Sequence, residues 1–131
     1  MSPSYADPRA LIQAALAKSD IPSVLVLTDP TKQAPYVHVI HVSGQTGPVD
    51  RMDTFRLDVV TRLESGEGFE AARTHLENIT TALTVGYHDT TAGYIDRIEL
   101  DEVTQPATSP LFPGPYTLAT LRGRMWTRPT H

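Results

Sequence analysis

The chain has 131 residues, no cysteine, and 15 Asp and Glu against 11 Lys and Arg, which gives a formal charge of -4. This length is typical of a single domain with one hydrophobic core, in which we expect only residues 1–6 and 129–131 to be loose. The lack of cysteine excludes disulfides, thiol nucleophiles and thiolate metal sites. The acidic balance is unlike that of a general nucleic-acid binder. No secretory signal is visible at the start, and apolar runs such as Val24 to Leu27 are too short to cross a membrane.

The first predicted element is a helix that runs from Pro8 to Lys18. Asp7 suits the N-cap and Pro8 the first helical position. The helix has one apolar stripe at spacings of three and four, made of Leu11, Ile12, Ala15 and Leu16.

Three strands are predicted next. Short strands are expected at residues 23–28 and 36–42, then a loop at 43–52 and a long strand at 53–64. Because side chains alternate along a strand, one face of the long strand is apolar and the other is charged. The apolar face has Phe55, Leu57, Val59 and Leu63, and the charged face has Arg56, Asp58 and Arg62.

The second half begins with the main predicted helix, at residues 69–85. An irregular strand follows at 94–103, then a segment at 105–115 with four prolines, and a final strand at 116–127. The main helix has a single apolar stripe, made of Phe69, Ala72, Leu76, Ile79 and Leu83. The predicted class is α+β, with a largely antiparallel sheet, one long helix packed on one face and a short N-terminal helix.

The histidines are the first candidates for chemistry. His38 and His41 lie on opposite faces of one strand, so they do not share a metal. His75 is expected to be solvated, and His88 to lie in a turn. No carboxylate pair stands beside a histidine in an enclosed position. We therefore expect no enzyme activity, no cofactor and no metal site.

Charge is segregated near the C-terminus. Residues 94–103 have four acids and one arginine, for a net charge of -3, whereas residues 116–131 have three arginines and no acid, for +3. A monomer has no obvious need for this segregation, but stacked or ring-forming subunits could use it for complementary contacts.

Three segments carry candidate assembly contacts, because aromatic and arginine side chains dominate interface energetics. They are the proline-rich segment, the last strand and the loop at 43–52. The residues are Leu111 and Phe112; Arg122, Arg124 and Trp126; and Asp50, Arg51 and Asp53. The alternative is that Leu111 and Phe112 fold onto the subunit's own core and Trp126 caps it.

The order of elements, together with particular residues, resembles the tail terminator proteins of long-tailed bacteriophages. The residues are the valine-rich strand from Val37 to Gly44, the long strand from Asp53 to Val59, Ala71 and Ala72 near the start of the helix, the strand from Gly93 to Ile98, and the last strand from Tyr116 to Arg124. The likeness covers nearly the whole chain.

The resemblance implies a structural protein of the virion tail that assembles in the host cytoplasm without a membrane. Its subunits would form a ring, expected to be hexameric, on the tail tube protein. The ring would stop tube growth and join the connector of the head. DNA would pass through the channel without specific binding, along a wall made electronegative by acids.

The candidate channel or ring-contact residues are Asp50, Arg51, Asp53, Asp96, Glu99, Asp101 and Glu102. One alternative is another head-tail joining or head-closure neck protein. An alternative from a different class is a small cytoplasmic ligand-binding domain or enzyme.

Overall fold

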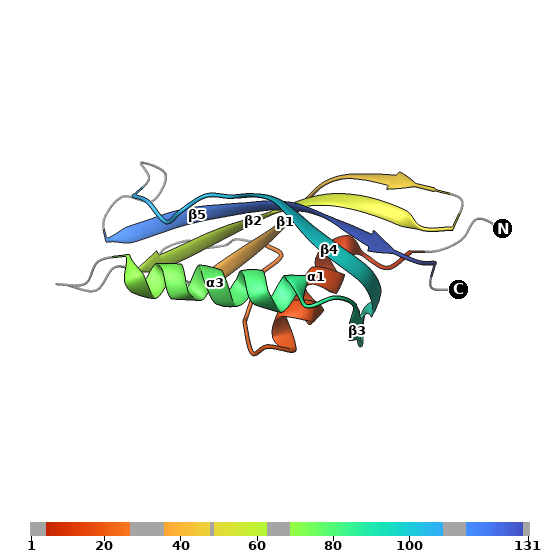
Figure 1. Ribbon diagram of the computed structural model, residues 1–131, viewed down its shortest axis with the longest axis horizontal. Coiled ribbons are helices and arrows are strands. Elements are labelled where there is room, and N and C mark those ends of the chain that lie inside the picture. The colour runs from red at the N-terminus through yellow and green to blue at the C-terminus, as the bar shows by residue number, and fades with distance from the viewer. Residues whose placement is uncertain (1–4, 27–35, 48, 63–68, 109–114, 130–131) are drawn as a thin grey trace.

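The structure is a computed structural model that describes residues 5–26, 36–47, 49–62, 69–108 and 115–129. Within these ranges, five strands form one antiparallel sheet in the order β1-β2-β5-β4-β3, and two helices cover one of its faces (Figure 1). The elements in chain order are α1 (Pro8–Ala17), β1 (Tyr36–Thr46), β2 (Arg51–Arg62), α3 (Glu70–Thr84), β3 (His88–Thr90), β4 (Gly93–Val103) and β5 (Tyr116–Thr127). The predicted α+β class with an antiparallel sheet is confirmed.

Helix α1 forms for the reasons that the sequence predicts. The Asp7 side chain accepts a hydrogen bond of 3.0 Å from the backbone N–H of Arg9, and Pro8 occupies the first helical position. The four residues of the predicted stripe are all buried. At the other end, Lys18 Nζ donates to the backbone oxygen of Asp89 on β3 over 2.7 Å, which ties the end of the helix to one edge of the sheet.

Helix α3 agrees with the predicted range to within one residue at each end. Its buried residues continue the predicted stripe and include Leu76, Ile79 and Leu83. These side chains meet α1 and the inner face of the sheet in one core cluster with Phe55, Leu57 and Val59 of β2. Burying an aliphatic side chain of this size contributes about 1.5–3 kcal/mol, so this layer is the main source of stability.

Two predictions in the first half of the chain are wrong. Of the short strand expected at 23–28, the described residues 23–26 form only a parallel bridge between Val24 and His38. The loop expected at 43–52 is mostly strand, because β1 continues to Thr46 and β2 already begins at Arg51. A bulge at Val42 shifts the register between His41 and Ser43. This shift interrupts the alternation of side chains, which concealed the hairpin in the sequence.

The second half of the sheet follows the sequence closely. The bounds of β5 match the prediction, and β4 has the expected irregularity, with register shifts at Asp96 and Asp101. His88, predicted to lie in a turn, is instead buried on β3, where its Nε2 lies 2.8 Å from the backbone oxygen of Leu83. The histidine therefore links the short edge strand to the end of α3.

A small second apolar cluster lies on the face of the sheet opposite the helices. Tyr36, Val60 and Leu118 are direct cross-strand partners on β1, β2 and β5, and Tyr36 and Val60 are buried. Ala107 pairs with Leu118 through two backbone hydrogen bonds, and the neighbouring Pro106 is also buried. The segment after β4 therefore stays attached to β5.

Several predictions concern residues at the margins of the described ranges. Leu63, Leu111 and Phe112 lie outside the described residues. Tyr5 and Ala6, expected to be loose, are half-buried, and Ala6 packs against the core. No helix in the described part of the chain is long and apolar enough to span a membrane.

Candidate functional site

The charged residues of β4 and β5 meet across the sheet. Antiparallel pairing places Glu99 opposite Arg124 and Glu102 opposite Arg122. Arg124 Nη2 lies 2.8 Å from Asp101 Oδ1 and 3.3 Å from Glu99 Oε2. The hydrogen bond to Asp101 raises the pKa of the Arg124 guanidinium. Near the end of β5, Arg128 Nε lies 3.0 Å from Asp96 Oδ1.

This pairing corrects the interpretation of the charge segregation. The acidic strand and the basic strand are neighbours in one sheet. Their opposite charges therefore form ion pairs within a single subunit. Asp96, Glu99 and Asp101 are neutralised by arginines of their own chain. The segregation is therefore no longer an argument for contacts between subunits.

Trp126 lies half-buried on β5 between arginine side chains. Its ring centroid is 4.1 Å from Cζ of Arg97 and 5.3 Å from Cζ of Arg124. Guanidinium groups are attracted to the face of an indole ring. The paired charges and the indole ring thus form one continuous surface on β4 and β5. Whether Trp126, Arg122 and Arg124 contact another subunit stays a prediction.

Asp53 is the most enclosed charged group among the described residues. Its side chain is 1% exposed, and its carboxylate accepts from Arg51 Nε over 3.0 and 3.1 Å. His41 Nε2 lies 2.8 Å from Asp53 Oδ1. Asp53, expected to be a channel or ring-contact residue, is turned inward by β2 beneath Arg51 and His41, so its carboxylate is not on the surface of the subunit. Gly44 leaves room for this cluster, since a Cβ there would collide with Arg51 and Asp53.

The turn between β1 and β2 is compact. The N–H of Gly47 donates to the backbone oxygen of Asp50 over 2.7 Å. Asp50 is half-buried there, whereas the neighbouring Val49 is 75% exposed. Of the three candidates from the predicted loop, Arg51 and Asp53 are thus brought together, and Asp50 stays apart in the turn.

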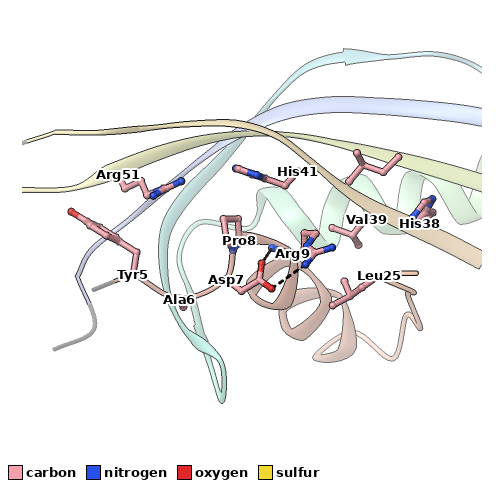
Figure 2. Close-up of a pocket in the computed structure, with 11 residues that line it drawn as sticks. Tyr5, Ala6, Asp7, Pro8, Arg9, Leu25, His38, Val39, His41 and Arg51 are labelled. Carbon is pink, nitrogen blue, oxygen red and sulfur yellow. Dashed lines mark hydrogen bonds and ion pairs between the residues drawn. The ribbon is translucent and has the colours of Figure 1, made fainter. Parts of the chain in front are cut away.

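A hollow of about 780 Å³ opens between β1 and the segment that leads into α1 (Figure 2). Tyr5 and Arg51 mark one end, where Arg51 Cζ lies 6.0 Å from the centroid of the Tyr5 ring. His38 and Leu25 mark the other end. The polar side chains that line it are Tyr5, Asp7, Arg9, His38, His41 and Arg51.

The sequence does not predict this hollow, although three of its lining residues, His38, His41 and Arg51, are among the candidates that the sequence offers. Strand alternation correctly placed His38 and His41 on opposite faces of β1. The sequence has no signal that brings Tyr5 and Arg9 alongside this strand, because that contact depends on how α1 docks. His75, predicted to be solvated, is half-buried on α3, and this burial lowers its pKa.

The described residues contain no group of three His, Asp or Glu side chains that could hold a metal ion. No protein-family model matches the chain, and no curated protein matches it either.

Proposed function

We propose that this protein is a structural tail terminator of a long-tailed bacteriophage, which forms a hexameric ring on the end of the tail tube. The main support is the arrangement of layers. Helices pack on one face of an antiparallel sheet, and the β1–β2 turn extends past them (Figure 1). Terminators combine a long helix on a sheet with extended hairpins, whereas head-closure proteins tend toward small β-barrels.

The exposed residues of the β1–β2 hairpin support a role in assembly. Val42 is 56% exposed and Val49 is 75% exposed, and both lie away from the core cluster. Exposed apolar side chains on a projecting hairpin are typical of a surface that a partner covers. A neighbouring subunit would bury them when the ring assembles. In the proposed ring, this turn contacts a neighbouring subunit.

The resemblance implies a channel wall made electronegative by acids. The face with β4 and β5 is compatible with the passage of DNA for a different reason, which is the pairing of its arginines. Protein affinity for DNA grows with the number of Lys and Arg side chains that replace counterions on the phosphates. On this face Arg124 and Arg128 are already paired with acids of the same chain. Such a surface would hold DNA weakly without needing an excess of negative charge.

Negative-stain microscopy of the purified protein, alone and mixed with tail tubes, tests the proposal. We expect six-fold rings and capped tube ends. Uncapped tubes of uncontrolled length in its presence would contradict it, and rings that bind connector complexes but not tubes would favour a head-closure protein.

A pair of variants tests the contribution of the hairpin. Val49→Asp should weaken ring formation while the far-ultraviolet circular dichroism stays unchanged. Ala71→Asp is the matched control, because it adds the same charge at an exposed position near the start of α3, away from the hairpin. Equal ring formation by both variants would show that the turn is not an assembly contact.

A further inference from the structure

The two edges of the sheet are protected to different degrees against the addition of another strand. Strand β3 has only three residues, and the backbone oxygen of Asp89 already accepts a hydrogen bond from Lys18 Nζ. Beyond the end of β3, the edge of β4 has four acidic side chains between residues 96 and 102. Short edge strands and charged side chains both prevent the addition of another strand. β1 differs, because residues 40–46 contain no Asp, Glu, Lys or Arg.

Part of the β1 edge is already paired, through the isolated bridge between Val24 and His38. The N–H of Val24 donates to the Val37 oxygen over 2.8 Å, and the N–H of Val39 donates to the Val24 oxygen over 3.0 Å. Successive residues of a strand direct their backbone groups to opposite sides. The backbone groups of His41 therefore face outward, as those of Val37 and Val39 do, and no described residue outside the sheet pairs with them.

The hollow beside β1 follows this same edge. Its wall on the sheet side consists of residues 38–41, and the segment from Tyr5 to Arg9 forms the opposite wall (Figure 2). Leu25, next to the bridge residue Val24, borders the hollow. Among the described residues, no segment pairs with the β1 edge beyond Val24, and a groove beside this part of the edge can accommodate an extended chain.

The side chains in the groove favour acidic groups. Arg51 bonds Asp53 through Nε, and its two terminal nitrogens donate no hydrogen bond to a described residue. The Arg9 guanidinium is 3.6 Å from Asp7, and its side chain is 43% exposed. Asp7 is the only acid among the lining residues, whereas two arginines and two histidines line the same groove. Guanidinium groups with unused donors bind carboxylates well.

We propose that this groove binds an extended acidic segment of a partner protein. The segment adds to the open edge of β1 through main-chain hydrogen bonds, and its carboxylates contact Arg9 and Arg51. Strand addition of this kind obtains affinity from the main chain and selectivity from the side chains. The inference does not depend on a ring, because a single subunit contains the whole groove.

Fluorescence anisotropy with labelled seven-residue peptides tests the proposal. The probe alternates valine with glutamate, a second peptide has lysine in place of glutamate, and a third is the glutamate peptide with N-methyl groups on its central backbone nitrogens. We expect saturable binding of the glutamate peptide, at least about tenfold weaker binding of the lysine peptide, and no binding of the methylated peptide.

Two protein variants locate the site. Arg9→Gln removes an exposed guanidinium from the groove and should weaken binding of the glutamate peptide by about threefold to tenfold. Arg73→Gln is the matched control, since Arg73 is exposed on α3 and does not line the groove. Thermal melts verify that both variants fold.

Several results would overturn the proposal. They are the absence of saturable binding, equal binding of the glutamate and lysine peptides, binding of the methylated peptide, or equal effects of the two protein variants. A dimer in analytical ultracentrifugation that the glutamate peptide does not dissociate would also overturn it, because the occupant would then be a second copy of this chain. A folded monomer that binds the peptide but caps no tubes would retain this inference and reject the terminator proposal.

Discussion

Tyr36 has a polar atom in an apolar setting. Its side chain lies in the small cluster with Val60, and its hydroxyl is buried with no hydrogen-bond partner among the described residues. Burial, with a smaller contribution from the charge of Asp58, raises the pKa of Tyr36 to about 12. A buried hydroxyl that makes no hydrogen bond costs free energy relative to its solvated state in the unfolded chain.

Tyr36→Phe should therefore leave the free energy of unfolding unchanged or raise it by up to about 1 kcal/mol, because it removes only the unpaired hydroxyl. Urea denaturation followed by circular dichroism measures the difference. Tyr94→Phe is the control, since the Tyr94 ring is exposed and stacked on Tyr87 at 5.6 Å between centroids. A loss of more than about 1 kcal/mol for Tyr36→Phe would show that the hydroxyl has a partner.

Residue roles were predicted well where they depend on local spacing, and poorly where they depend on register. Alternation along β2 was sufficient to assign Phe55 and Leu57 to the core. Asp53 shares the buried face of Phe55 and Leu57 by the same alternation, but its contact with His41 lies beside the register shift at Val42, which no pattern in the sequence reveals. The burial of His88 likewise depends on a contact with the end of α3.

At the scale of elements, both helices and β5 were predictable because each has a long, regular pattern. The β1–β2 hairpin was not predictable, because two glycines and a proline within five residues, Gly44, Gly47 and Pro48, are typical of a loop. Gly44 is needed for a different reason, namely the space that the Arg51 and Asp53 side chains occupy above it. The charged strands β4 and β5 were found individually, but strand order in a sheet is not encoded in the composition of either strand.

Strand β5 has a glycine in its middle, where a side chain would normally contribute to the sheet. A Cβ on Gly123 would lie 2.6 Å from the backbone oxygen of Glu99 and 2.8 Å from Cζ of Phe55. The glycine thus lets the Phe55 ring lie against the strand. Its role is packing rather than backbone flexibility.

Gly123→Ala should lower the free energy of unfolding by about 1–3 kcal/mol, because the added methyl group forces Phe55 and β4 to move. Differential scanning calorimetry would show the loss as a lower Tm. Gly47→Ala should lower the free energy of unfolding by less. A Cβ there would lie 3.2 and 3.3 Å from two oxygen atoms of Asp50. An unchanged Tm for Gly123→Ala would contradict the close packing of Phe55 on this strand.

For the whole molecule, the distribution of charge matters more than the net value of -4. Cross-strand pairs remove most of the charge from the face with β4 and β5, and Arg51 neutralises the buried Asp53. Arg9 and Arg51 remain beside the groove with donors to spare. Both are paired with acids of the chain, Arg9 with Asp7 and Arg51 with Asp53, but their remaining N–H donors lie beside the β1 edge, where the proposed acidic segment binds.

Two titrating groups define the pH range in which the folded state is most stable. Burial lowers the pKa of His75, which borders a hollow shared with Asp20 and Asn78. Below about pH 6.5 the unfolded chain therefore binds a proton at His75 more readily than the folded chain, and stability falls as the pH drops. Tyr36 has the opposite effect at high pH. Between about pH 10 and 12 the unfolded chain loses the tyrosine proton first, so stability falls as the pH rises.

The Tm should consequently be highest between about pH 6.5 and 10 and decrease on both sides. Thermal melts from pH 5 to 11 measure this profile, and variants assign its two limits. His75→Gln should reduce the decrease between pH 6.5 and 5, where most carboxylates are still ionised, and should leave the alkaline side unchanged. Tyr36→Phe should reduce only the alkaline decrease. If His75→Gln left the acid side as steep as in the unmodified chain, the half-buried position of His75 on α3 would not be the cause.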